Sequence, residues 1–275
     1  MAFQFPGAGA LDYSACRYGS SKVQFRGPGG DLTRDYCAFI GGTETYGKFV
    51  PDPFPAIVEA RLGLTMVNLG CVNAGIDVFL NEPAFAEVAA GARCTVVQIV
   101  GAHNLSNRFY TVHPRRNDRF IAASPLLKKL FRDVDFTEFD FTRHMLGALE
   151  RHSAERYALV VDELRLAWTS RMQTLLTRLS ARTILLWVAN HPPGKPAAAL
   201  PLQRDPTLVD AAMIAAVRSH ASQYVEVVGS PLARMNGLRG MVFAELDRPA
   251  AAEVIGPGVH REVATALAPV LQALI

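Results

Sequence analysis

The chain has 275 residues, 50% of them hydrophobic, which is enough to bury one sizeable core and is a routine size for a single α/β domain. Its 28 basic and 25 acidic residues leave a net charge of only +3, which excludes a global electrostatic attraction to nucleic acid or to a membrane surface. The four cysteines are widely spaced, which argues against a disulfide or zinc set and predicts reduced packing residues.

The first 35 residues precede the first apolar segment and are rich in Gly, Tyr and Arg. They are predicted to form an arm that packs on a single domain spanning residues 36–275. The first ten residues lack the basic and continuous apolar regions of a secretory signal, and the longest apolar runs have only strand length. The sequence therefore predicts a cytoplasmic protein that makes no contact with membrane.

Apolar, β-branched segments of strand length alternate with helical patterns from residue 36 onward. The predicted strands are residues 36–40, 64–69, 94–100, 183–189 and 224–228. The predicted helical segments are residues 54–62, 82–91, a long set of helices from about 124 to 180, 206–222 and 260–274. This alternation predicts an α/β fold with a doubly wound sheet of about five mainly parallel strands in the flavodoxin-like order 2-1-3-4-5. The stretch between the third and fourth strands exceeds a simple crossover, so a helical insertion at about residues 105–180 is predicted to form a cap or an oligomer surface.

The first predicted strand runs directly into a Gly-rich turn, Gly-Gly-Thr-Glu-Thr-Tyr-Gly at residues 41–47. A buried strand that breaks into such a turn and then a helix is how α/β enzymes expose a hydroxyl nucleophile at the carboxyl edge of a sheet. Thr43 would stand on this turn. The alternative is that Thr43 only caps the helix that follows.

Residues 39–47 resemble the first block of the SGNH (GDSL) esterase and acyltransferase superfamily, in which Gly-Asp-Ser follows a strand. Three later segments resemble the remaining blocks of that superfamily in the right order. These segments are residues 67–75, 96–104 and 255–260. The resemblance implies the same flavodoxin-like fold, with the four blocks meeting at the carboxyl edge of the sheet.

The resemblance also implies a role for individual residues. Thr43 would be the nucleophile and His260 the general base, while the backbone N–H of Gly70 and the side chain of Asn104 would stabilise the oxyanion. The neighbouring residues expected to contact the substrate are Gly42, Glu44, Asn73 and His103.

The chain departs from the superfamily pattern at the chemically important positions. Gly42 replaces the Asp of the first block, and Thr43 replaces the nucleophilic Ser. Pro257 stands three residues before His260, where the triad Asp should lie. A backbone carbonyl, Glu253 or Asp247 would then have to orient the imidazole, and the sequence leaves these alternatives open.

Arginine is concentrated in the loop that follows the third predicted strand. The four arginines are Arg108, Arg115, Arg116 and Arg119, and the loop holds one acid, Asp118. Guanidinium groups bind carboxylate, sulfate or phosphate in a bidentate manner, so these residues are candidates to bind an anionic or sugar-like ligand. The alternative is that they pair with acids of residues 133–140 and hold the insertion in place.

Two functions follow from these patterns. The first is an SGNH-like esterase or O-acyltransferase that acts on a polar, sugar-like or anionic ester. The alternative is a non-hydrolytic protein of the same fold that binds an anionic ligand, or transfers a group from a sulfated or phosphorylated donor, through the Arg-rich loop. No cofactor or metal is expected, because no His, Cys or carboxylate residues share a ligand spacing. The expected partner is a small molecule or carbohydrate rather than nucleic acid, and self-association stays open.

The chain also resembles an uncharacterised family of alphaproteobacterial proteins. The shared phrases are Phe-Arg-Gly-Pro at residues 25–28, the Gly-rich turn at 41–47, Leu-Ser-Asn-Arg-Phe-Tyr at 105–110 and His-Pro-Arg-Arg-Asn-Asp-Arg-Phe at 113–120. This resemblance groups the chain with other sequences but implies no activity.

Overall fold

The computed structural model describes residues 9–179, 182–194, 202 and 204–275. Its centre is a five-stranded parallel sheet in the order β2-β1-β3-β6-β7. The strands are β1 (Tyr36–Gly41), β2 (Thr65–Gly70), β3 (Cys94–Gln98), β6 (Thr183–Ala189) and β7 (Gln223–Val228). The predicted α/β class and the predicted strand order are confirmed, since β1, β2, β3, β6 and β7 take the positions of a 2-1-3-4-5 sheet.

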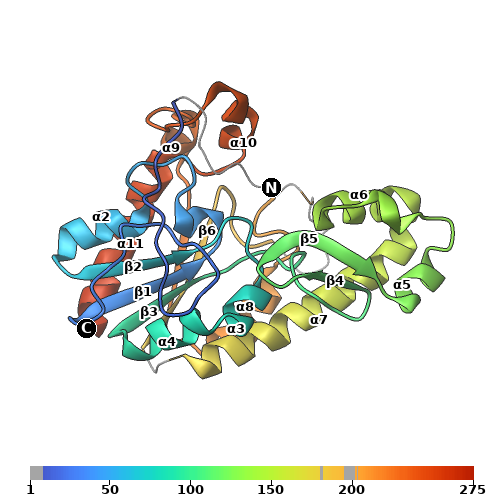
Figure 1. The fold of residues 1–275 in the computed structure, drawn as a ribbon, viewed down its shortest axis with the longest axis horizontal. Helices are drawn as coiled ribbons and strands as arrows, with labels where there is room; N and C mark the ends of the chain where they lie inside the picture. Colours follow the sequence, from blue (N-terminus) through green and yellow to red (C-terminus); the bar gives the residue numbers. More distant parts are fainter. Residues whose placement is uncertain (1–8, 180–181, 195–201, 203) are drawn as a thin grey trace.

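Helices cover both faces of this sheet (Figure 1). Side chains alternate between the faces of a strand, so Cys37 and Phe39 of β1 join one apolar core while Ala38 and Ile40 join the other. The first core also contains α2 (Phe54–Leu62), α9 (Pro231–Met235) and α11 (Pro257–Leu274), and the second contains α3 (Ile76–Asn81), α4 (Pro83–Gly91), α7 (Ala154–Arg178) and α8 (Ala211–Arg218). Burial on both faces explains why β1 is apolar along its whole length.

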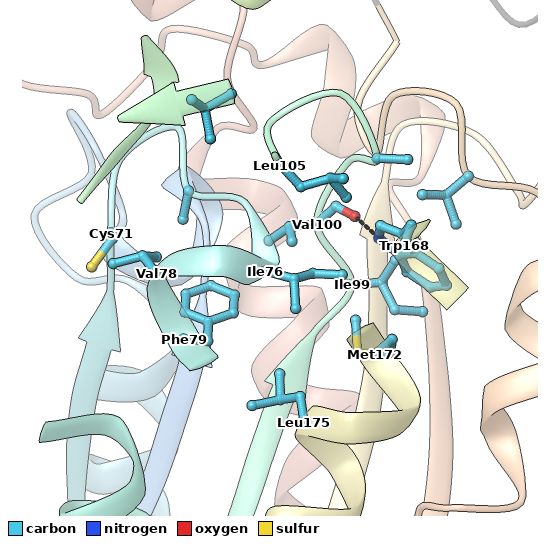
Figure 2. Packing of buried hydrophobic residues seen from close by; sticks show 14 of the residues in the cluster. Cys71, Ile76, Val78, Phe79, Ile99, Val100, Leu105, Trp168, Met172 and Leu175 are labelled. Carbon is cyan, nitrogen blue, oxygen red and sulfur yellow. Dashed lines mark hydrogen bonds between the residues drawn. The ribbon is translucent and has the colours of Figure 1, made fainter. Parts of the chain in front are cut away.

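The second core closes beneath the carboxyl end of β3, where α3 and α7 meet (Figure 2). Trp168 of α7 is fully buried, and its indole N–H donates to the carbonyl oxygen of Val100 at 2.8 Å. Met172 and Leu175 continue the apolar face of α7 below it. The long helix is therefore tied to the strand end that leads into the candidate site.

The insertion between β3 and β6 contains strands as well as helices. Its elements are β4 (Tyr110–His113), β5 (Arg116–Ala123), α5 (Pro125–Leu130), η1 (Phe136–Glu138), α6 (Thr142–His152) and α7. The antiparallel hairpin of β4 and β5, together with α5 and α6, projects beyond the sheet at the right of the view (Figure 1). The long helical set predicted from about residue 124 to 180 consists of three helices and a 3-10 turn, and Ser153 separates the last two helices by capping the start of α7. Residue 180 lies outside the described residues.

The described part of the N-terminal segment packs against the domain. Tyr18 and Phe25 are buried in the second core, and backbone bonds in both directions join Cys16 to Phe25. Arg26 is also buried, and its guanidinium donates to the carbonyl oxygens of Tyr46, Gly47 and Pro51 at 3.2, 2.7 and 2.6 Å. The segment therefore holds the loop that follows the Gly-rich turn. Residues 1–8 of the predicted arm lie outside the described residues.

The remaining elements are short. They are α1 (Thr43–Tyr46), η2 (Glu245–Asp247) and α10 (Arg248–Ala252). The helix predicted over residues 206–222 is confined to α8, which begins where the Asp210 carboxylate accepts from the N–H groups of Ala212 and Met213. None of the helices in the described ranges combines the length and apolarity that crossing a membrane requires.

Candidate functional site

A cavity of about 390 Å³ lies at the carboxyl edge of the sheet. The turns after β1, β2 and β3 reach it, and so do the start of α6, the loop before α8 and the end of α10. The polar and charged residues that line it are Thr43, Glu44, Lys48, Asn73, Gln98, His103, Asn104, Asp118, Thr142, Arg143, Asp205 and Glu253. Segments far apart in the sequence therefore converge on one polar site.

Thr43 begins α1 at the wall of this cavity. Its hydroxyl oxygen accepts a hydrogen bond from the backbone N–H of Asn73 at 3.0 Å. The same hydroxyl donates to Asn73 Oδ1 at 3.4 Å. Asn73 is a non-glycine residue in the left-handed region, with φ of 55°. The turns after β1 and β2 are thus joined through the Thr43 hydroxyl, which faces the cavity. Thr43 is the first residue of α1, and the N-cap position before it is Gly42. No side chain therefore caps this helix, and Thr43 does not have the capping role that the alternative gave it.

Gln98, the last residue of β3, organises the Gly-rich turn. Its Oε1 accepts from the N–H groups of Gly42 and Thr45 at 3.0 and 3.1 Å and from the Thr45 hydroxyl at 2.6 Å. These three donors fix the orientation of the amide, so Nε2 donates to Glu44 Oε2 at 2.6 Å. Burial raises the pKa of Glu44, and the nearby Asp205 carboxylate raises it further. Gln98 therefore holds in the cavity a carboxyl group whose pKa lies above its usual value.

His103 follows β3 and is only 5% exposed. Its Nδ1 is buried and has no hydrogen-bond partner among the described residues. Burial lowers the pKa of His103 to about 4, although Asp205 opposes this effect, so the imidazole is neutral at pH 7. His103 lines the cavity, and a neutral imidazole can accept a proton there.

Asp205 lies on the loop before α8 and is fixed by two neighbours. Arg143 Nη2 donates to it at 2.8 and 2.9 Å, and the Thr207 hydroxyl donates to it at 2.6 Å. Asp205 is half-exposed, so burial opposes its charge only in part, and His103, Arg143 and Thr207 hold its pKa below the usual value. Asp205 therefore favours its ionised form and lines the same cavity as His103.

The two expected oxyanion donors have partners within the protein. The N–H of Gly70 donates to Asn68 Oδ1 at 2.8 Å. Asn104 Nδ2 donates to the carbonyl oxygen of Asn73 at 3.0 Å, while its Oδ1 accepts from the Thr142 hydroxyl at 2.6 Å. Asn104 lines the cavity, but its amide holds the walls together in this structure.

The structure places His260 away from the cavity that Thr43 lines. His260 is 1% exposed, stacks on Phe54 with 5.7 Å between ring centroids, and accepts from the Phe54 N–H through Nδ1 at 3.1 Å. It shares a helical stripe with the buried Val263, Ala264 and Leu267 of α11. Spacings of three, four and seven residues from His260 are the sequence signal for this inward direction.

The two acids expected to orient His260 lie in different places. Glu253 lines the cavity, whereas Asp247 belongs to η2 and is not among the described residues that line it.

The four arginines of the loop after β3 do not line this cavity. Arg108 forms an ion pair with Glu163 at 2.6 Å, while Arg115 and Arg116 are exposed at the tip of the β4–β5 hairpin. Arg119 lies over the ring of Phe141, 4.4 Å from its centroid. The acid partner of Arg108 comes from α7, not from residues 133–140 as the alternative expected.

Several residues that line the site were not singled out from the sequence, among them Phe141, Arg143 and Asp205. Of these three, two come from the start of α6 and one from the loop before α8, so no local motif connects them with the Gly-rich turn. Among the described side chains, no three His, Cys, Asp or Glu residues are arranged to bind a metal ion.

The fold and the site define an α/β protein with a flavodoxin-like sheet and a polar cavity at its carboxyl edge. The chain belongs to the family described as Domain of unknown function (DUF6473), whose model matches residues 1–275. A comparison with curated proteins found no match. The alphaproteobacterial grouping stays a prediction.

Among solved structures, the chain is similar to two Streptomyces enzymes. One is an extracellular lipase from Streptomyces rimosus, with 10% identity and a TM-score of 0.43 over 88% of this chain and 100% of the lipase. The other is phospholipase A1 from Streptomyces albidoflavus NA297, with 10% identity and a TM-score of 0.42 over 88% of this chain and 99% of that enzyme.

Proposed function

We propose that the cavity is the active site of an enzyme that cleaves or transfers the acyl group of a polar ester. The observation that carries this proposal is that Thr43, His103 and Asp205 line one cavity at the carboxyl edge of the sheet. A hydroxyl, a neutral imidazole and an ionised carboxylate are the three groups that nucleophilic acyl transfer needs.

In the proposed reaction, the Thr43 oxygen attacks the ester carbonyl carbon and His103 takes the hydroxyl proton. Asp205 stabilises the imidazolium that results, because an ionised carboxylate favours the charged form of its neighbour. The alkoxide leaves with the proton from His103, and an acyl–Thr43 intermediate remains. Water or an acceptor hydroxyl then attacks this intermediate, giving hydrolysis or transfer. His103 replaces His260 as the proposed base, because His260 already accepts from the Phe54 N–H.

The alternative function, binding of an anionic ligand or transfer from one through the Arg-rich loop, has less support. Arg108 is paired with Glu163, and Arg119 contacts Phe141. The described residues that line the cavity include four carboxyl groups, those of Glu44, Asp118, Asp205 and Glu253, against the two cations Lys48 and Arg143. An anion would meet unfavourable electrostatics there.

The test is turnover of acetyl and butyryl esters of p-nitrophenol and of O-acetylated sugars by the full chain. Thr43→Ala should lower kcat/KM by about 10³-fold or more, whereas Thr43→Ser keeps a hydroxyl and should retain activity. His103→Asn should lower kcat, and in the wild type the acidic limb of kcat/KM should fall near pH 4, since the pKa of His103 is lowered to about 4.

Two exposed positions supply matched controls. Thr111→Ala and His220→Asn make the same chemical changes outside the cavity and should leave turnover unchanged. Ester turnover that survives Thr43→Ala would show that Thr43 is not the nucleophile. A rate limit near pH 6.5 that survives His103→Asn would assign the base elsewhere.

A further inference from the structure

Phe141 is an unusual residue in the cavity wall, because it is a large apolar side chain that is 41% exposed. The cavity wall also contains smaller apolar residues, among them Ile99, Val100 and Val188, so Phe141 is its one aromatic ring among the described apolar residues. An exposed aromatic ring in a cavity wall offers a flat apolar surface to a ligand.

The ring of Phe141 is held from one side. The Arg119 guanidinium carbon lies 4.4 Å from the ring centroid, and an antiparallel bridge joins the backbones of Arg119 and Phe141. The adjoining N–H of Phe120 donates to the carbonyl oxygen of Asp140 at 3.0 Å. The hairpin therefore fixes the ring and covers one of its faces, while Phe141 stays 41% exposed and lines the cavity.

The two residues after Phe141 form hydrogen bonds with residues at the carboxyl edge of the sheet and in the loop before α8. Thr142 donates to Asn104 at 2.6 Å, and Arg143 donates to Asp205 at 2.8 Å. Phe141 thus has a defined position relative to the proposed reactive groups, although it belongs to the insertion and they belong to the sheet edge and its loops.

We propose that Phe141 is the platform on which the ring of a neutral sugar stacks, so that the substrate is an uncharged carbohydrate ester. One face of a pyranose ring consists of C–H groups and packs on an aromatic ring, while its edge carries hydroxyl donors. The carboxyl groups of Glu44, Asp118 and Asp205 are acceptors for such donors. Their excess over Lys48 and Arg143 selects against sugars that carry a carboxylate, sulfate or phosphate.

The ester part of this inference rests on the proposed function, whereas the sugar part does not. Sugar binding can therefore be tested separately from ester turnover. The probes are methyl glucopyranoside, methyl xylopyranoside, methyl N-acetylglucosaminide and methyl glucuronide, measured by isothermal titration calorimetry against the full chain. At least one neutral glycoside should bind saturably, and the glucuronide should bind about tenfold or more weakly.

Variants of Phe141 distinguish a sugar from an acyl chain. Phe141→Trp and Phe141→Tyr keep an aromatic ring and should retain binding, whereas Phe141→Leu keeps only apolarity and should weaken binding about tenfold. Phe243→Leu is the matched control, because Arg248 lies over that ring at 5.6 Å and Phe243 is not among the cavity-lining residues. It should leave binding unchanged.

Three results would overturn the inference: binding that Phe141→Leu retains in full, a preference for the glucuronide, or no binding of any neutral glycoside. The first would show that the sugar does not stack on the ring of Phe141. Neutral glycoside binding without ester turnover would uphold the sugar platform and refute the proposed function. Turnover of p-nitrophenyl esters without glycoside binding would do the reverse.

Discussion

The backbone N–H of Phe54 donates to Nδ1 of His260 at 3.1 Å across 206 positions of the sequence. This bond requires the Nδ1 lone pair, so it exists only while the imidazole is neutral. His260 therefore joins the start of α2 to the first turn of α11 and stabilises the packing of the two helices on the sheet.

His260 should make the protein sensitive to acid. Burial, with a smaller contribution from Arg26, lowers the pKa of His260 to about 3, against an ordinary value of 6.5. Between these values the unfolded chain binds a proton that the folded chain does not, so stability falls as the pH falls. From pH 7 to pH 5 the loss should be about 2 kcal/mol for this residue, and His103 should add a similar loss, since its pKa is lowered to about 4.

His260→Asn tests this assignment by urea unfolding at pH 7 and pH 5. The Asn carbonyl can still accept from the Phe54 N–H, so the variant should lose about 1–3 kcal/mol at pH 7 through poorer packing. Its further loss on going to pH 5 should be smaller than that of the wild type by about 2 kcal/mol. His220→Asn, at an exposed position, should follow the wild type. An unchanged pH dependence in His260→Asn would contradict the assignment.

Gln98→Glu should place two carboxyl groups in contact. The new side chain keeps an acceptor for Gly42 and Thr45 but loses the donor to Glu44 Oε2. Two like charges in contact raise the pKa of the pair in the folded state. The folded chain then holds a proton that the unfolded chain has already released. Stability is therefore lost as the pH rises through the folded pKa.

Thermal unfolding at pH 5 and pH 7.5 measures this effect. Gln98→Glu should lose about 1–3 kcal/mol more than the wild type at pH 7.5 and recover part of it at pH 5. Gln98→Leu removes the acceptor from three buried donors, so its loss should not depend on pH in this way. Equal pH dependence in the two variants would refute the contact between the carboxyl groups.

Arg26→Lys should loosen the loop after the Gly-rich turn. The guanidinium reaches three carbonyl oxygens in diverging directions, and an ammonium group cannot reproduce that geometry. A loss of about 1–3 kcal/mol in the free energy of unfolding is expected from denaturant titration. Arg17→Lys, at an exposed position of the same segment, should change stability by less than about 0.5 kcal/mol. Equal stability of the two variants would mean that the arm does not hold this loop.

Gly75→Ala should disrupt the join between the turns after β2 and β3. A Cβ atom at Gly75 would lie 1.5 Å from the carbonyl oxygen of Asn104, so backbone would have to move. The expected cost is about 3 kcal/mol or more, seen as a lower Tm or as failure to fold. Gly29→Ala is the control, since its Cβ would lie 3.5 Å from Cys16, an ordinary contact. A Gly75→Ala protein with the Tm of the wild type would disprove the close approach.

Much of the sheet was predictable because its strands carry a strong local signal. Each of β1, β3 and β6 is buried along its whole length, so the sequence shows continuous apolar runs bounded by polar or Gly-rich turns. The hairpin of β4 and β5 was not predicted, since β5 mixes charged and apolar residues and its pairing with β4 contains register shifts. Local patterns are weak where a strand is partly exposed and irregular.

The sequence by itself determined the α/β class, the strand order and the edge of the sheet at which Thr43, Glu44, Asn73 and His103 stand. It could do so because the direction of a parallel strand decides the edge at which the following turn lies. Only the tertiary structure decided that His260 points into the core beside Phe54, and that Phe141, Arg143 and Asp205 complete the cavity. Each residue of a helix turns the side-chain direction by about 100°, and long connections bring distant segments together through packing that no short motif records.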